Sequence, residues 1–163
     1  MSIAQSMLPE FDNEMANTRK MLERVPQDKL DYKPDPKSMP LGHLAGHIAE
    51  MVGWTTSTFK EDSIDIPPDF KPFDPKSSAE VLETFEKNSK AARAALADAP
   101  DSGMMNNWSL KFGGKEMFSM PRIAVYRSMI MNHVIHHRAQ LGVYYRMVGV
   151  PVPGMYGPSA DEK

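Results

Sequence analysis

Apolar side chains recur at steps of three and four residues along four long stretches of this chain. That spacing places them on one face of an α-helix. We therefore expect helices over residues 3–24, 38–60, 79–97 and 119–148. The four stretches predict an all-α protein in which the apolar helix faces pack against one another.

Prolines and small polar residues mark the expected ends of these helices. Ser38 and Ser119 each lie two residues before a proline and fit as N-caps. Ser77 and Glu80 form a capping-box pattern for the third helix. The connector over residues 61–76 contains four prolines and is expected to be a loop. Connectors of this length predict a four-helix bundle with at least one crossover.

A short alternating segment interrupts the helical pattern before the last helix. Residues 108–112 alternate between apolar and polar side chains, and Gly113-Gly114 follows them as a turn dipeptide. This segment predicts a small β-hairpin. The tail over residues 148–163 has no period and is expected to lie irregularly over the surface. The length fits a single domain spanning residues 1–163.

Composition narrows the classes of partner. The 163 residues carry a net charge of −2 and no sustained run of Lys or Arg, which argues against nucleic-acid binding. No apolar run approaches the roughly 20 residues that span a bilayer, so no membrane partner is expected. The N-terminus lacks the pattern of a signal peptide and the chain has no cysteine, which fits a cytoplasmic location. A cysteine nucleophile and thiolate metal ligands are excluded.

All five histidines lie in two of the expected helices. His43 and His47 are four residues apart on the second helix, and His133, His136 and His137 cluster on the fourth. Side chains four residues apart share a helix face, with Cβ atoms roughly 5–6 Å apart, so two imidazoles can chelate one metal ion. His133 and His137 follow the apolar seam of their helix, and His47 borders the inner face of its own. His43 fits either that face or the outer one.

Two interpretations compete for these histidines. A single histidine on an apolar face is more often a hydrogen-bonded core or surface residue than a ligand, whereas two pairs on two helices favour a metal site. Three imidazoles would leave a fourth coordination position for water or substrate, as in catalytic sites. Neutral nitrogen ligands suit a divalent transition metal, zinc or nickel first, with iron and cobalt also acceptable.

The chain resembles a known family at three motifs. They are Gly46-His-Ile-Ala-Glu50, the pattern His133-x-x-His-His-Arg-Ala-Gln-Leu141, and the tail segment Tyr156-Gly-Pro-Ser-Ala-Asp161. The resemblance is to the DinB-like (DinB/YfiT) superfamily and covers nearly the whole chain. It implies a metal-binding four-helix bundle and a metal triad of His47, His133 and His137. The extra His43 departs from that pattern, as a fourth ligand or as a residue lining the pocket.

Three other polar residues near the histidines are candidates for a catalytic role. Glu50 follows His47 by three residues and fits as a base or as an acceptor for an imidazole N–H, with a solvated glutamate as the alternative. Arg138 and Gln140 fit as anchors for a substrate carboxylate or as groups that orient a ligand. Ordinary surface and capping roles are the alternatives for this pair.

The resemblance also carries the expected function. Related bundles include thiol-dependent S-transferases and mycothiol-dependent maleylpyruvate isomerase. They imply metal-dependent transfer or hydrolysis on a small molecule, with an exogenous low-molecular-weight thiol because this chain has no cysteine. The alternative is a non-catalytic metal-binding protein of the stress response that serves as an interaction module.

A homodimer is expected as well, because one bundle has more apolar side chains than it can obviously bury. The side chains that prompt this expectation are Ile3, Met7, Phe11, Met15, Met129 and Met131. Coverage of these faces by the hairpin segment and the tail within one chain is the alternative.

Overall fold

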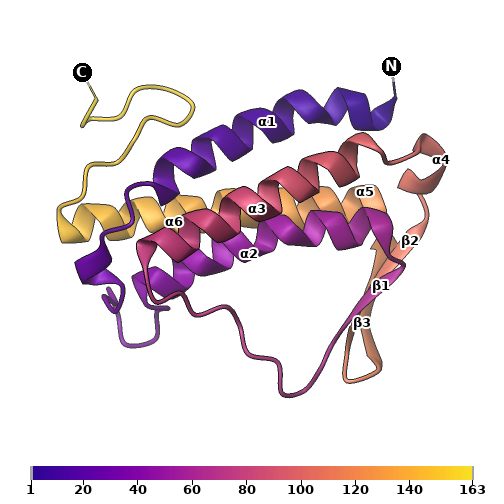
Figure 1. The fold of residues 1–163 in the computed structure, drawn as a ribbon, viewed down its shortest axis with the longest axis horizontal. Helices are drawn as coiled ribbons and strands as arrows, with labels where there is room; N and C mark the ends of the chain where they lie inside the picture. The colour runs from indigo at the N-terminus through magenta and orange to yellow at the C-terminus, as the bar shows by residue number, and fades with distance from the viewer. Residues whose placement is uncertain (1, 163) are drawn as a thin grey trace.

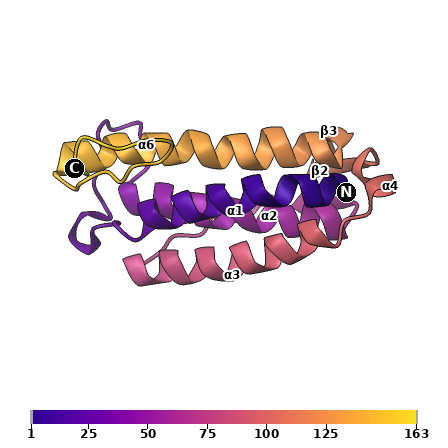
Figure 2. The same cartoon turned by 90° about the horizontal axis from the view of Figure 1, so that it is seen from above.

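Four long helical segments lie side by side in the computed structural model, which describes residues 2–162 (Figure 1). Figure 2 shows the same four segments from above, nearly parallel to one axis. Three of them are α1 (Ile3–Leu22), α2 (Leu41–Lys60) and α3 (Ser78–Ala97). The fourth is a run of α5 (Arg122–Ala124), the π-helix η2 (Val125–Met131) and α6 (Asn132–Val148). Two short helices, η1 (Gln27–Lys29) and α4 (Asp101–Met104), lie in the connectors.

The core forms where the apolar faces of these helices meet. Phe11 of α1, Ile48 of α2, Phe85 of α3 and Leu141 of α6 are all essentially buried. These side chains follow the predicted three- and four-residue spacing, which confirms the inner faces read from the sequence. Within residues 2–162, no helix is both long enough and apolar enough to cross a membrane.

One of the three predicted caps is correct in part, and the other two are wrong. The Ser77 hydroxyl accepts the Glu80 N–H (3.1 Å) at the start of α3, as expected. The Ser38 prediction is wrong, because α2 starts after Pro40 and no side chain caps it. Its first N–H groups instead donate to backbone carbonyls of the preceding connector, Leu41 to Tyr32 (2.9 Å) and Gly42 to Leu30 (2.8 Å).

In addition, a capping box closes the start of α1. The Ser2 hydroxyl accepts the Gln5 N–H (3.1 Å), and the Gln5 side chain accepts the Ser2 N–H (3.0 Å). At α3 the reciprocal bond differs, because Glu80 accepts the Lys76 N–H (2.7 Å). A carboxylate in the first turn still satisfies an otherwise unpaired backbone donor there.

A small sheet modifies the all-α prediction. The expected hairpin is confirmed as β2 (Asn107–Phe112) antiparallel to β3 (Lys115–Pro121). Gly113 and Gly114 form its turn with positive φ angles of 57° and 81°, as a primed turn requires. A third strand, β1 (Ser63–Ile66), pairs parallel with β2, so residues 61–76 are not wholly a loop. The protein is therefore mostly helical with a three-stranded sheet.

The hairpin also corrects the start of the fourth helix. Ser119 pairs with Ser109 inside the sheet, so it cannot cap a helix. The helical run starts at Arg122, directly after Pro121. The Arg122 guanidinium ties this start to the end of α2, where it donates to the carbonyls of Thr58 and Glu61.

The π-helix was not expected from the sequence. Buried side chains in η2 recur five residues apart, Val125 with Ile130 and Tyr126 with Met131. The Asn132 N–H donates to the Arg127 carbonyl, also five residues back. This widened turn lies directly before the histidine cluster, and π-turns within helices are frequent at functional sites.

A close approach at Gly46 links α2 to the connector before α3. A Cβ atom at Gly46 would lie 2.8 Å from Pro75 Cδ and 3.2 Å from Phe73 Cδ1. We expect Gly46→Ala to displace this connector and to lower the free energy of unfolding by about 1–3 kcal/mol, the usual cost of overpacking. Chemical denaturation of the purified variant measures the change.

Gly142 provides the matched control within another helix. A Cβ there would meet Met21 Cε at 3.6 Å, an ordinary van der Waals contact. Gly142→Ala should therefore be neutral or slightly stabilising, since alanine favours a helix interior by about 1 kcal/mol. Equal destabilisation of both variants would contradict the role assigned to Gly46.

Candidate metal centre

Three histidines from two helices converge at the contact between α2 and α6. Each of His47, His133 and His137 offers a ring nitrogen, and these nitrogens all lie within 4.8 Å of one another. The ring centroids are 5.3 Å apart for His47 and His133, 4.9 Å for His47 and His137, and 4.6 Å for His133 and His137. His137 is buried, whereas His47 and His133 are partly exposed. This grouping can hold a metal ion, and solvent reaches two of its three side chains.

The other two histidines lie outside this group. His43 is partly exposed on α2, one turn before His47, and it does not belong to the three-nitrogen group of the described residues. His136 is exposed, with its ring centroid 5.0 Å from that of His137. The geometry therefore selects one histidine from the first H-x-x-x-H pair and both from the second.

Two of the three imidazoles have hydrogen-bond partners behind the site. The Nδ1 atom of His133 lies 3.3 Å from the Met129 carbonyl, one turn earlier in η2. The Nδ1 atom of His137 lies 2.7 Å from Gln140 Oε1 on α6. Gln140 was a candidate from the sequence, and the structure places it in contact with His137 of the candidate group. Both contacts engage Nδ1 and leave Nε2 as the remaining ring nitrogen.

Burial favours neutral imidazoles in the triad. Desolvation is the largest influence on His47 and lowers its pKa to about 4, with further lowering from the neighbouring imidazoles of His137, His133 and His43. Desolvation also lowers the pKa of His137, partly opposed by its hydrogen bond to Gln140. A metal ion requires neutral imidazole ligands, so these rings are ready to bind one at neutral pH.

These lowered pKa values predict acid sensitivity of the metal-free protein. An unfolded histidine titrates near pH 6.5, and folded His47 near pH 4, so unfolded chains take up protons first as the pH falls. The stabilisation should be fully present above about pH 6.5 and be lost as the pH falls towards about 4. Because His47 is partly exposed, this stabilisation will be smaller than that of a fully buried imidazole.

Urea unfolding in the presence of a chelator, at about pH 7.5 and about pH 5, measures the loss of stability. Between these two pH values, His47→Leu should lose less stability than the wild type. An equal loss in both proteins would show that His47 is not the source of the pH dependence.

Arg138 was a candidate anchor for a substrate, and the structure places it in a buried ion pair. Its side chain is 3% exposed and donates to Glu14 Oε2 (2.6 Å) and to the Glu14 carbonyl (3.0 Å). It also donates to Thr18 Oγ1 (3.0 Å) and to the Tyr156 hydroxyl (2.6 Å), which in turn donates to Glu14. All of these partners belong to the protein, so Arg138 joins α6 to α1 and to the C-terminal segment.

Sequence reasoning missed Glu14 and Thr18 in this network. The available signal was the position of Glu14, three residues after Phe11 on the apolar face of α1. Glu50, the other candidate, is partly buried one turn along α2 from His47. Among residues 2–162, no hydrogen bond joins Glu50 to an imidazole.

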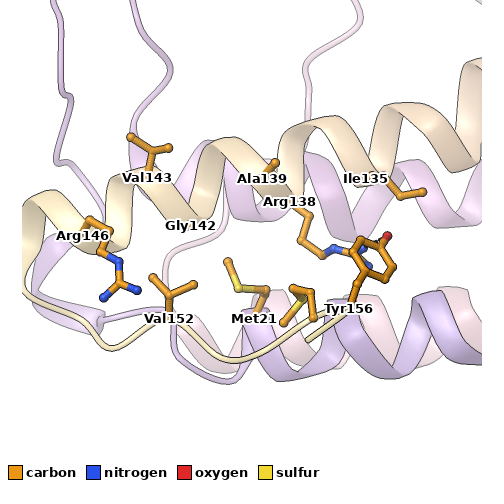
Figure 3. A pocket seen from close by; sticks show the side chains of 10 residues that line it. Met21, Ile135, Arg138, Ala139, Gly142, Val143, Arg146, Val152 and Tyr156 are labelled. Carbon is orange, nitrogen blue, oxygen red and sulfur yellow. Dashed lines mark hydrogen bonds between the residues drawn. The ribbon is translucent and has the colours of Figure 1, made fainter. Parts of the chain in front are cut away.

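An apolar cavity of about 420 Å³ lies between α6, α1 and the C-terminal segment (Figure 3). Arg138 and Tyr156 lie at one end of it, Arg146 lies at the other, and Met21 and Val152 lie between. None of the three triad histidines lines this cavity. The cavity and the histidine group thus occupy different sides of α6.

Comparison with known proteins places this chain in a family. The model of the DinB family matches residues 1–163. The uncharacterized protein YrdA of Bacillus subtilis (strain 168) is 27% identical over 159 residues, covering 95% of this chain and 89% of that protein. The chain therefore belongs to the DinB family.

Two solved structures share the fold. The crystal structure of a DinB-like protein from Bacillus cereus ATCC 10987 matches with a TM-score of 0.71 at 24% identity, covering 93% of this chain and 97% of that chain. The DinB-like protein YjoA from Bacillus subtilis matches with a TM-score of 0.68 at 18% identity, covering 97% and 99%. At these identities the likeness establishes the arrangement of helices and strands.

Proposed function

We propose that the protein binds one divalent transition metal ion through His47, His133 and His137. The observation that carries this proposal is the approach of three ring nitrogens, from two helices, to within 4.8 Å of one another. The four long helical segments serve as a four-helix bundle that holds α2 and α6 in contact at this point. Zinc and nickel suit three imidazoles best, and iron and cobalt are also compatible.

The activity that this site supports is metal-dependent transfer or hydrolysis on a small molecule. Three protein ligands leave an open position, where a bound metal would lower the pKa of a thiol or water and so supply a nucleophile. The chain has no cysteine, so a thiol must come from a low-molecular-weight co-substrate. In transfer, a carbon–sulfur bond forms at the electrophile, the leaving group departs with its electron pair, and the thiol proton passes to solvent.

One observation favours a second candidate, a non-catalytic metal-binding protein that acts as an interaction module. The apolar cavity of about 420 Å³ is lined by Arg138 but by none of the triad histidines. An enzyme of this kind needs an acceptor-binding pocket that reaches the metal. The two candidates therefore share the metal site and differ in whether a substrate binds beside it.

Cobalt titration tests the metal site and its open position together. Metal-free protein without a polyhistidine tag should bind one Co²⁺ and develop a visible absorption spectrum. A low-molecular-weight thiol should then shift that spectrum by coordinating the metal. Saturation without any response to thiols would favour the interaction module, and absence of cobalt binding would reject both candidates. Assays of thiols against electrophilic acceptors, with and without metal, separate the enzyme from the module.

We also propose a cytoplasmic homodimer, although the structure changes the reason for the dimer. Met7, Phe11, Met15 and Met131, which prompted the expectation, are buried within one chain. The exposed apolar side chains include Val143 (59% exposed) and Met147 (54%) on α6, and Ile3 (36%) on α1. Covering such side chains favours association. Light scattering should give twice the 18.3 kDa chain mass, and a persistent single-chain mass at rising concentration would contradict the dimer.

A further inference from the structure

We propose that Gln140 and the Met129 carbonyl act as positioning groups that fix the tautomers of two metal ligands. Each holds a proton on Nδ1 of its histidine, so that His137 and His133 both direct the unprotonated Nε2 into the site. The inference rests on the proposed function for the identity of the ligand, a divalent metal. The tautomers themselves are a property of the protein without metal.

The first contact fixes the tautomer of His137. A neutral imidazole has one donor nitrogen and one acceptor nitrogen. The Gln140 Oε1 atom, 2.7 Å from His137 Nδ1, is a carbonyl oxygen and can only accept. Nδ1 must therefore carry the proton, and the lone pair lies on Nε2. Gln140 is three residues after His137, a spacing that places both side chains on the same face of α6.

The second contact fixes the same Nδ1–H tautomer for His133. The backbone carbonyl of Met129 can only accept, so the 3.3 Å contact requires the proton on His133 Nδ1. Met129 belongs to the π-helix η2, whose C-cap bond runs from the Asn132 N–H to the Arg127 carbonyl. His133 is the next residue, so its ring bonds back into the widened turn at the junction with α6. A carbonyl oxygen has two lone pairs and can accept from an imidazole as well as from the helix.

Together the two contacts pre-organise the site. The rings of His133 and His137 lie 4.6 Å apart by their centroids, and each faces the His47 ring at about the same separation. A metal needs lone pairs that converge, and hydrogen bonds on the opposite ring nitrogen are the common means of aiming them. Loss of such a partner weakens metal binding by about 10–100-fold. Gln140 is exposed, so its removal should affect this alignment without loss of core packing.

Nuclear magnetic resonance of the metal-free protein tests the tautomers directly. Protein with ¹⁵N-labelled histidine is examined at about pH 8, where imidazoles with an ordinary pKa near 6.5 are neutral. Long-range ¹H–¹⁵N spectra distinguish the protonated from the unprotonated ring nitrogen. We expect His133 and His137 as Nδ1–H tautomers, the opposite of the Nε2–H form that an exposed histidine side chain favours in water. An Nε2–H tautomer at His137 would mean that the Gln140 amide donates, and it would overturn the inference.

Three variants test the consequence for metal binding. Gln140→Leu removes the acceptor at similar volume and should lower the Nδ1–H fraction of His137 and weaken Co²⁺ binding by about 10–100-fold. Gln140→Glu keeps an acceptor oxygen and should preserve both the Nδ1–H fraction of His137 and the affinity for Co²⁺. Ala139→Leu adds the same leucine at the neighbouring exposed position and should change neither. All three should keep the wild-type melting temperature.

The outcomes separate this inference from the proposed function. If Gln140→Leu changes the tautomer but binds Co²⁺ as tightly as the wild type, the positioning role is wrong while the metal site stands. If the wild type shows the expected tautomers but binds no Co²⁺, the metal function is wrong, and the hydrogen-bond assignment is retained on its own spectra. Weaker Co²⁺ binding by Gln140→Leu, restored in Gln140→Glu, supports both.

Discussion

His133→Ala and His137→Ala are each expected to lose tight metal binding, measured as bound metal per chain after dialysis against a weak chelator. Each substitution removes one of three converging nitrogens, and two imidazoles alone form an incomplete site. The loss should exceed the roughly 10–100-fold that follows removal of a supporting hydrogen bond. His47→Ala should behave in the same way, although it lies on the other helix.

His136 and His43 supply matched controls for this experiment. His136 is exposed in the same cluster, and His43 lies one turn from His47, yet neither belongs to the group of converging nitrogens. His136→Ala and His43→Ala should therefore retain near wild-type metal content. Loss of metal in His43→Ala would make His43 a fourth ligand. Equal metal content in the wild type and in all three triad variants would contradict the proposal that His47, His133 and His137 bind the metal.

The second large effect is expected at Glu14. Glu14→Ala leaves the Arg138 guanidinium buried without its carboxylate, at a position only 3% exposed. Breaking a buried ion pair by removing one partner costs about 3–5 kcal/mol. For a chain of this length each kcal/mol lowers the melting temperature by about 2–4 °C. Thermal and urea unfolding followed by circular dichroism will measure the loss.

A double variant and a surface pair control the Glu14 experiment. Glu14→Leu combined with Arg138→Met replaces both charges by apolar groups and should recover most of the stability, because no charge is then buried alone. Asp12→Ala breaks the exposed pair between Asp12 and Arg93 and should shift the midpoint far less. If the Glu14 and Asp12 variants lose the same stability, burial is not what gives the Glu14–Arg138 pair its importance.

The helices and the hairpin could be predicted because their signals are local. Apolar spacing and the Gly113-Gly114 turn depend only on neighbouring residues. β1 could not be predicted, because four residues directly before a Pro-Pro pair acquire strand structure only by pairing with β2. Ser38 does not cap α2 for a similar reason. The backbone carbonyls of Leu30 and Tyr32 accept the first N–H groups of α2 instead.

The candidate site, too, could be predicted only where its signals are local. Each H-x-x-x-H pair indicates a shared helix face, but only packing of α2 against α6 selects His47 and leaves His43 aside. The π-turn of η2 was hidden because side chains five residues apart look like a slightly irregular helical stripe. The surroundings of Arg138 likewise depend on packing between distant segments. Beside histidines it resembled a substrate anchor, whereas its partner Glu14 lies 124 residues away and is recognisable only in three dimensions.

The Glu14–Arg138–Tyr156 network also bears on how quickly the chain reaches its native state. It joins residues separated by 124 and 142 positions along the chain. Helices form in about a microsecond, whereas contacts between distant parts of a chain are reached more slowly because loop closure costs entropy first. A folding chain can therefore form α1, α2 and α3 early, whereas this network is completed late, when α6 and the C-terminal segment pack against α1. Truncation before Tyr156 should leave Arg138 without one partner and should mainly speed unfolding, because contacts that form late in folding act on the unfolding rate.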